Sequence, residues 1–238
     1  MVLQDEAIEA LVAKYVSNNM VISFGTSPES VRFAKKLALK IEEEEINVKV
    51  VPTNNKIAEI LTDLDIKMTT INDKEIDLAI EFVDLVDKEF NFIERESGSF
   101  VRDKMIAQSA AELIVITEAK NYGKPLKGLI PFEVCSFGWK RTLLQLEKLG
   151  MAKARERNGK MFKTETGHYV IDVNVDEIYS LEDLEFQAKD IPGVLETGLF
   201  IGYADRVLLH NGGLDMLSRL DYSKQNKLPS EEKGIIML

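Results

Sequence analysis

The chain has 238 residues, of which 45% are hydrophobic, and its formal net charge is −10. A net negative charge of this size repels the phosphates of nucleic acids, so we expect no nucleic-acid partner. No segment approaches the roughly 20 consecutive apolar residues that a membrane-spanning helix needs, so we expect no membrane contact.

Cysteine and histidine are scarce in this chain. The single cysteine, Cys135, excludes an internal disulfide and is typical of a reducing compartment. The acidic, amphipathic amino terminus lacks the basic start and the apolar run of a secretory signal. The two histidines, His168 and His210, have no partner ligands at metal spacing, so we interpret them as surface or hydrogen-bonded side chains. We therefore expect a cytoplasmic protein that uses no metal and no cofactor.

Short apolar runs alternate with amphipathic stretches in the first half of the chain, which predicts βαβ units around a parallel sheet. Helices are predicted at 7–16, 29–45, 54–61 and 103–113, and strands at 20–24, 48–51, 77–80 and 114–117. Pro28 suits the first turn of the second helix, where its missing N–H costs nothing. Sheets of this kind bind ligands outside the carboxyl ends of their strands, which here are residues 25–26, 52–53 and 81–84.

After a polar linker at 120–127, short half-exposed strands and helices predict a second, smaller unit. Strands are predicted at 131–135, 161–163, 169–173 and 193–197, with helices at 137–149 and 181–188. A strand at 204–209 returns to the first unit, and we expect part of the polar tail at 211–238 to be mobile. The predicted fold is α/β: a Rossmann-like, doubly wound, mostly parallel sheet with a smaller inserted α+β domain. The large domain would comprise 1–127 plus 200–238, and the small domain 128–199.

Several segments together resemble one protein family. They are DLAI at 77–80, DLVD at 84–87, RDKMIA at 102–107, PFEV at 131–134, WKR at 139–141, LLQLEKLG at 143–150, IPGV at 191–194, ETGLF at 196–200 and AD at 204–205. In their order and spacing they are similar to the A-type ribose-5-phosphate isomerases, over about residues 3–210.

The resemblance implies a metal-free aldose–ketose isomerase that interconverts ribose 5-phosphate and ribulose 5-phosphate through an enediolate. It implies three catalytic carboxylates, Asp103, Asp84 and Glu81, with Asp103 as the base. The substrate would bind at a turn before a helix, and its contacts would come from Gly25, Thr26, Ser27, Glu94, Arg95 and Lys120. A homodimer or homotetramer is also implied.

The chain departs from the family's pattern at four places around this site. The family's phosphate turn, Gly-Thr-Gly-Ser-Thr, reads GTSPE at 25–29, and its Asp-Gly-Ala-Asp reads EFVD at 81–84. Its lysine and glycine run are replaced by ERESG at 94–98, and its catalytic glutamate by Asp103. A carboxylate such as Glu29, about 5 Å from a phosphate, would repel it by several kcal/mol. An aspartate base is about one methylene shorter, and proton transfer requires hydrogen-bond reach.

These departures leave three hypotheses open. The first is an isomerase with weakened or altered activity, in which Arg95 or Lys120 supplies the positive charge. The second is a catalytically inactive paralogue that acts as a binding or regulatory subunit. The third is a binder of a non-phosphorylated polyol, which an acidic cleft would attract. Two of these residues also have a purely structural interpretation. Glu29 is then part of an ordinary helix start, and Lys120 is an ordinary lysine of the linker.

Overall fold

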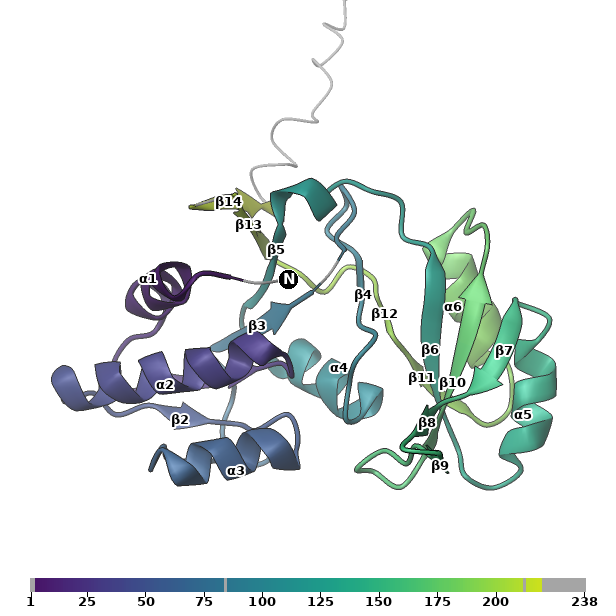
Figure 1. Cartoon of the computed structure of the whole chain (residues 1–238), viewed down its shortest axis with the longest axis horizontal. Coiled ribbons are helices and arrows are strands. Elements are labelled where there is room, and N and C mark those ends of the chain that lie inside the picture. Colours follow the sequence, from purple (N-terminus) through teal and green to yellow (C-terminus); the bar gives the residue numbers. More distant parts are fainter. Residues whose placement is uncertain (1–2, 84, 212, 220–238) are drawn as a thin grey trace, which may run out of the picture.

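The computed structural model describes residues 3–83, 85–211 and 213–219. These residues form a six-stranded sheet in the order β14-β13-β5-β3-β1-β2 (Figure 1). Its strands are β1 (Val21–Phe24), β2 (Lys49–Val50), β3 (Leu78–Phe82), β5 (Leu113–Glu118), β13 (Arg206–His210) and β14 (Leu214–Ser218). The strand pairs are parallel except for β13 with β14, which confirms the expected mostly parallel sheet.

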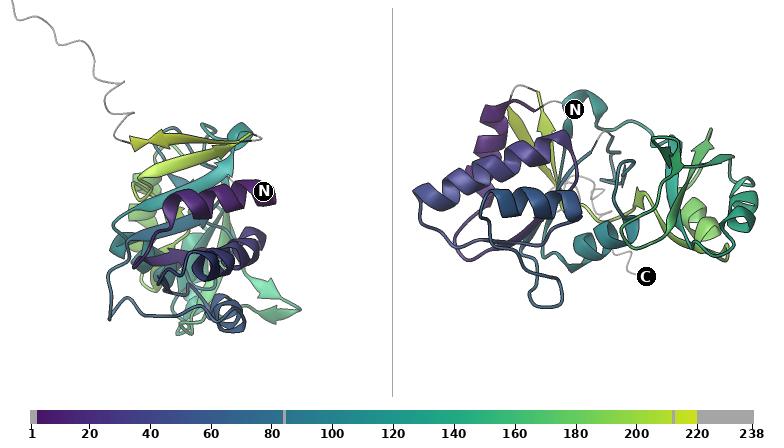
Figure 2. Two further views of the ribbon diagram at one scale, coloured as in Figure 1. Left: turned by 90° about the vertical axis from the view of Figure 1, so that its left-hand side faces the viewer. Right: turned by 60° about the horizontal axis from the view of Figure 1, so that its bottom comes forward.

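Helices cover both faces of this sheet because alternate strand residues point to opposite sides. Ile22, Ile80 and Ile114 pack with α1 (Asp5–Tyr15), α2 (Pro28–Glu43) and α3 (Asn55–Asp63), which lie together on one face (Figure 2). Val21 and Val115 pack on the other face with α4 (Phe100–Ser109). The sheet is therefore doubly wound, as predicted.

A second sheet, in the order β11-β6-β10-β7, is antiparallel and stands apart from the first (Figure 1). Its strands are β6 (Gly128–Val134), β7 (Met151–Ala154), β10 (Tyr169–Val175) and β11 (Val194–Thr197). Helices α5 (Trp139–Leu146) and α6 (Leu181–Lys189) pack on one face, and a hairpin of β8 (Glu156–Arg157) and β9 (Lys160–Met161) extends from it. These elements are the small α+β unit; the predicted boundaries at 127/128 and 199/200 stay a prediction.

Helix α4 joins the two units. Its buried Lys104 lies 2.7 Å from both Glu185 of α6 and Glu196 of β11. A two-stranded ladder of β4 (Phe92–Ile93) and β12 (Leu199–Phe200), which the sequence did not predict, runs alongside. A 3₁₀ turn, Ala119–Asn121, follows β5. No helix among the described residues is long and apolar enough to cross a membrane.

The boundaries of one helix were predicted wrongly. The helix predicted at 103–113 spans Phe100–Ser109, because the side chain of Ser99 caps it by accepting the Arg102 N–H at 3.3 Å. It ends early because the Ala111 N–H pairs with the Ile76 carbonyl at 2.8 Å and draws the chain into the sheet. Within the tail at 211–238, Leu214–Ser218 is a strand that the sequence did not predict. Residues 220–238 lie outside the described residues, so the expected mobility of part of the tail stays a prediction.

Gly198 sits where the chain passes from the small sheet to the large unit. Its N–H donates to the Pro131 carbonyl and its carbonyl accepts from Glu94 N–H, both at 2.8 Å. A Cβ at this position would lie 2.4 Å from the Glu94 carbonyl oxygen. We expect Gly198→Ala to lower the free energy of unfolding by about 2 kcal/mol, because backbone and a proline ring would have to shift. Urea denaturation measures this loss.

The matched control is Gly213→Ala, where the nearest neighbouring atom would lie 4.0 Å from the new Cβ. Equal stability of the two variants would contradict the close-packing account of Gly198.

Candidate functional site

The first wall of the candidate site is the turn between β1 and α2. Ser27 caps α2: its Oγ accepts the Ser30 N–H at 3.2 Å, and the Ser30 Oγ accepts the Ser27 N–H at 3.0 Å. Pro28, the first residue of the helix, has no N–H to offer. Thr26 Oγ1 accepts a hydrogen bond from Asn54, which caps α3. The donors at this helix start are thus largely used within the protein.

Gly25 allows a carboxylate to pack directly against the backbone at the end of β1. A Cβ on Gly25 would lie 1.7 Å from Oε2 of Glu81, which is in the neighbouring strand β3. Only glycine leaves room for this contact, so the observed position of the Glu81 carboxyl requires glycine at residue 25.

Glu81 is a buried carboxyl with other carboxyls around it. Burial raises its pKa well above the ordinary value, and the nearby charges of Asp103 and Glu94 raise it further. The raised pKa favours the protonated form of Glu81, which can donate a hydrogen bond.

Asp103 lies in the first turn of α4 and is also buried. Ser97 Oγ donates a short hydrogen bond to its carboxylate, and the same Oγ accepts the Ser99 N–H at 2.9 Å. Burial raises the pKa of Asp103 to about 7, against the opposing effect of the Ser97 hydrogen bond; Glu133 raises it further. Arg102 lowers that pKa and Glu165 raises it, both weakly relative to burial. The result is a carboxyl that titrates near neutrality, which suits a general base.

A cavity of about 160 Å³ opens between the β1–α2 turn and the segment after β4. Residues 26–29 form one wall, residues 93–96 form the other, and Phe82 and Val83 at the end of β3 complete it. It therefore lies at the carboxyl ends of two parallel strands, where doubly wound sheets bind ligands.

The charges lining this cavity are mostly negative. Glu29 is only 2% exposed, and the guanidinium of Arg32 lies 3.7 Å from its carboxylate. Glu94 belongs to the opposite wall and accepts the Glu96 N–H at 2.9 Å. The guanidinium of Arg95 donates to the backbone carbonyls of residues 127 and 129, each at 3.1 Å. The Arg95 guanidinium is thus partly occupied by hydrogen bonds to carbonyls at the start of β6.

The remaining residues predicted for the site are placed differently. Lys120 follows β5 with 73% of its side chain exposed and forms an ion pair with Glu118 at 2.5 Å; it is not among the residues that line the cavity. Asp84 lies outside the described residues. The structure thus brings Gly25, Glu81 and Asp103 together, with Thr26, Ser27, Glu94 and Arg95 in the cavity walls.

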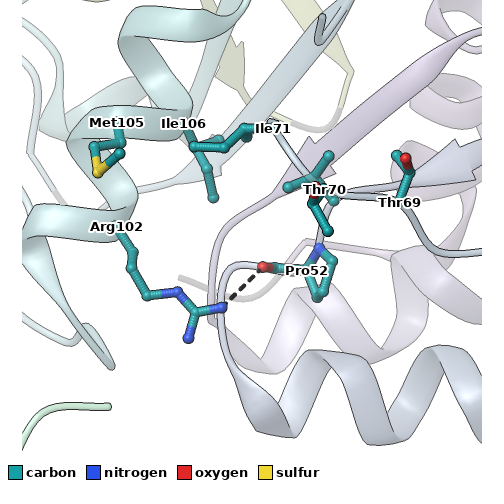
Figure 3. Close-up of a pocket in the computed structure, with 8 residues that line it drawn as sticks. Pro52, Thr69, Thr70, Ile71, Arg102, Met105 and Ile106 are labelled. Carbon is teal, nitrogen blue, oxygen red and sulfur yellow. Dashed lines mark hydrogen bonds between the residues drawn. The ribbon is translucent and has the colours of Figure 1, made fainter. Parts of the chain in front are cut away.

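A second cavity, of about 220 Å³, lies against the other side of α4 (Figure 3). Apolar side chains such as Ile71, Met105 and Ile106 line it. Its one charged side chain, Arg102, donates to the Pro52 carbonyl at 3.4 Å (Figure 3). Arg102 also pairs with Glu165 at 2.6 Å. Glu81 and Asp103 line neither cavity. The first cavity is lined by Phe82, the residue next to Glu81, and by Glu94, whose charge raises the pKa of Glu81, so we take the first cavity as the candidate site.

Sequence reasoning did not single out Ser97, Ser99 or Glu133 as functional residues. Glu133 is fully buried and its carboxylate lies 2.9 Å from His168 Nδ1. A charged residue within a buried strand is unusual, and this was the sequence signal that could have identified Glu133.

His210 Nδ1 lies 3.2 Å from the Gly213 carbonyl. Among the described residues, no group of three or more His, Cys, Asp or Glu side chains is arranged to hold a metal ion.

Asp103→Asn tests the protonation state of the site through stability. The folded chain binds an extra proton between pH about 4, where an unfolded aspartate titrates, and about 7, the pKa of Asp103. The stability that this carboxyl contributes is therefore complete below pH about 4 and is lost as the pH rises to about 7. Relative to the native chain, Asp103→Asn should gain up to roughly 1.4 kcal/mol per pH unit across this range. Urea unfolding at several pH values measures it, and parallel curves would contradict the raised pKa.

The comparisons with known proteins agree with one another. The family model "Ribose 5-phosphate isomerase A (phosphoriboisomerase A)" matches residues 49–213. Ribose-5-phosphate isomerase A 2 of Oceanobacillus iheyensis is 33% identical over 92% of this chain and 100% of its own length. Ribose-5-phosphate isomerase A of a Synechococcus species is 32% identical over 86% of this chain and 91% of its own.

Solved structures give the same result. Ribose 5-phosphate isomerase A of Methanocaldococcus jannaschii superposes with a TM-score of 0.83 at 26% identity, covering 90% of this chain and 98% of its own. A D-ribose-5-phosphate isomerase solved in complex with phospho-erythronic acid has a TM-score of 0.83 at 27% identity, with 90% and 97% covered. The chain therefore belongs to the ribose-5-phosphate isomerase A family.

Proposed function

We propose that the chain interconverts ribose 5-phosphate and ribulose 5-phosphate, with activity weakened by its altered phosphate end. The observation that supports this most is the buried pair of Asp103 and Glu81, whose carboxyls have raised pKa values beside the cavity of a family scaffold. An aldose–ketose isomerase needs one base near neutrality and one acid that stays protonated.

In the proposed reaction, the Asp103 carboxylate removes the C2 proton of the open-chain aldose. The electrons move into a C1–C2 double bond, which leaves an enediolate with its charge on O1. Protonated Glu81 donates a hydrogen bond to this developing charge. Asp103 then returns the proton to C1, a proton passes from the C2 hydroxyl to O1, and the ketose forms with no net gain or loss of atoms.

We propose that Gly25, Thr26 and Ser27 contact the substrate, with Asp84 as a further carboxylate near its hydroxyls. Glu94 is proposed to lie beside the bound substrate. The phosphate end would depend on Arg95 and Lys120 for positive charge. Because Glu29 and Glu94 flank the same cavity, we expect weak phosphate binding and a high KM. By family likeness we also propose a homodimer or homotetramer, and a cytoplasmic location in view of the single cysteine.

The first test is turnover of ribose 5-phosphate by the purified chain and by Asp103→Ala. We expect the variant to lose about 10²–10⁴-fold in kcat/KM, the usual contribution of a general base. In the native chain, kcat/KM should rise with pH and level off above about pH 7, because the base acts as its carboxylate.

Glu59→Ala, which removes an exposed carboxylate on α3, serves as the control and should leave turnover unchanged. A folded native chain with no turnover, and no thermal stabilisation by millimolar sugar phosphate, would favour the inactive binding subunit or the polyol binder instead.

A second test restores the family's cation by Glu94→Lys. We expect KM for ribose 5-phosphate to fall about tenfold or more, because an attraction replaces a repulsion at the phosphate end. Glu94→Gln should give a smaller gain, and unphosphorylated ribose should show none. Equal gains for ribose and its phosphate would show that Glu94 does not face the phosphate.

A further inference from the structure

Glu133 is a fully buried carboxylate on strand β6. Its neighbours Phe132 and Val134 pack among the helices of the small unit. Strand residues alternate between faces, so Glu133 points to the opposite face, toward the start of α4. A buried charge of this kind must be satisfied by donors.

The described residues provide those donors from two segments. At the start of α4, the Val101 N–H donates at 3.0 Å and Ser99 Oγ at 3.1 Å. From the loop before β10, Thr164 Oγ1 donates at 2.8 Å and Thr166 Oγ1 at 2.6 Å, while His168 Nδ1 lies at 2.9 Å. Glu133 thus ties the first turn of α4 to two parts of the small unit.

That first turn is the one that carries Asp103. The Asp103 N–H donates to the Ser99 carbonyl at 3.1 Å, and Val101 lies two residues before it. Ser99 also holds Ser97, whose Oγ binds the Asp103 carboxylate. A shift of Glu133 would therefore move the reacting carboxylate through the backbone of a single helical turn.

Glu133 also acts on Asp103 through its charge. Burial favours its neutral form, but the hydrogen bonds from Thr166, Val101, His168 and Thr164 prevail and lower its pKa below the ordinary value. Glu133 is then ionised throughout the range in which Asp103 titrates, and like charges resist ionisation of the second group.

We propose that Glu133 is a positioning residue of this site: from the small domain, it fixes the first turn of α4 and biases the protonation of Asp103. The inference rests on the proposed role of Asp103 as the base. A carboxylate on β6 would thereby set both the position and the working pH of the Asp103 carboxylate on α4.

Other charged groups also face Asp103, and the test has to separate them from Glu133. They are Glu81 of β3, Arg102 of α4 itself and Glu165 of the loop before β10; Glu94, after β4, acts on Glu81. Two substitutions at position 133 isolate its own effect. Glu133→Gln removes the charge and keeps an acceptor oxygen, whereas Glu133→Asp keeps the charge and shortens the reach.

We expect Glu133→Gln to move the acid limb of the kcat/KM profile to lower pH by about one unit, because Asp103 loses a neighbouring negative charge. Glu133→Asp should leave the acid limb in place and lower kcat about 10–100-fold with little change in KM, because the first turn of α4 shifts. An unmoved acid limb in Glu133→Gln, with native-like melting, would overturn the proposal.

Thr142→Val is the matched control for lost stability. Thr142 is a buried residue of α5 in the small unit whose Oγ1 donates to the Pro192 carbonyl at 3.2 Å, and its replacement changes no charge. The variant should lower the melting temperature and leave the acid limb unchanged. An acid limb that moves equally in Thr142→Val would show a general effect of destabilisation and contradict a specific role for Glu133.

A readout independent of turnover separates this inference from the proposed activity. Carbon-13 NMR of aspartate carboxyls, assigned with Asp103→Asn, follows the titration of Asp103 directly. We expect its midpoint to fall in Glu133→Gln and to stay near the native value in Glu133→Asp. If the chain shows no turnover but these shifts occur, the proposed activity fails while the coupling holds; unchanged midpoints overturn the coupling.

Discussion

Buried carboxyls at the junction of the two sheets are the constraint on which this site depends. Glu81, Asp103 and Glu133 come from three different elements and are all withdrawn from water. A buried carboxyl must either take up hydrogen-bond donors or keep its proton. Glu133 takes the first course and is ionised, whereas Glu81 and Asp103 take the second and have raised pKa values. The junction thus holds one ionised carboxylate beside two carboxyls whose ionisation is disfavoured.

The architecture explains why these groups meet. Parallel strands β1 and β3 end side by side, which brings Gly25 against Glu81. Helix α4 lies between the large sheet and the small one. The small unit holds it there through Glu185 and Glu196, which pair with Lys104, and through Glu133, which accepts the Val101 N–H. The part of the site that contains Glu81 and Asp103 is thus held in place by both sheets, so its geometry depends on how the large and small units pack together.

The start of α2, where the phosphate is proposed to bind, is built differently from this junction. The start of α2 is capped by its own serines, and Glu29 and Glu94 put negative charge into the adjoining cavity. Such a helix start is a stable one, but it attracts an anion less than an uncapped glycine turn would. The family scaffold is nevertheless retained.

The alternation of apolar and polar residues determined the fold class, because periodicity decides which face of a strand or helix is buried. Family-like segments also located Asp103 and Glu81 along the chain. Only the tertiary structure decided that Glu133 reaches the first turn of α4 from the small sheet. It also decided that the Arg95 guanidinium donates hydrogen bonds to backbone carbonyls. These features depend on contacts between residues 30 or more positions apart, which local sequence patterns do not record.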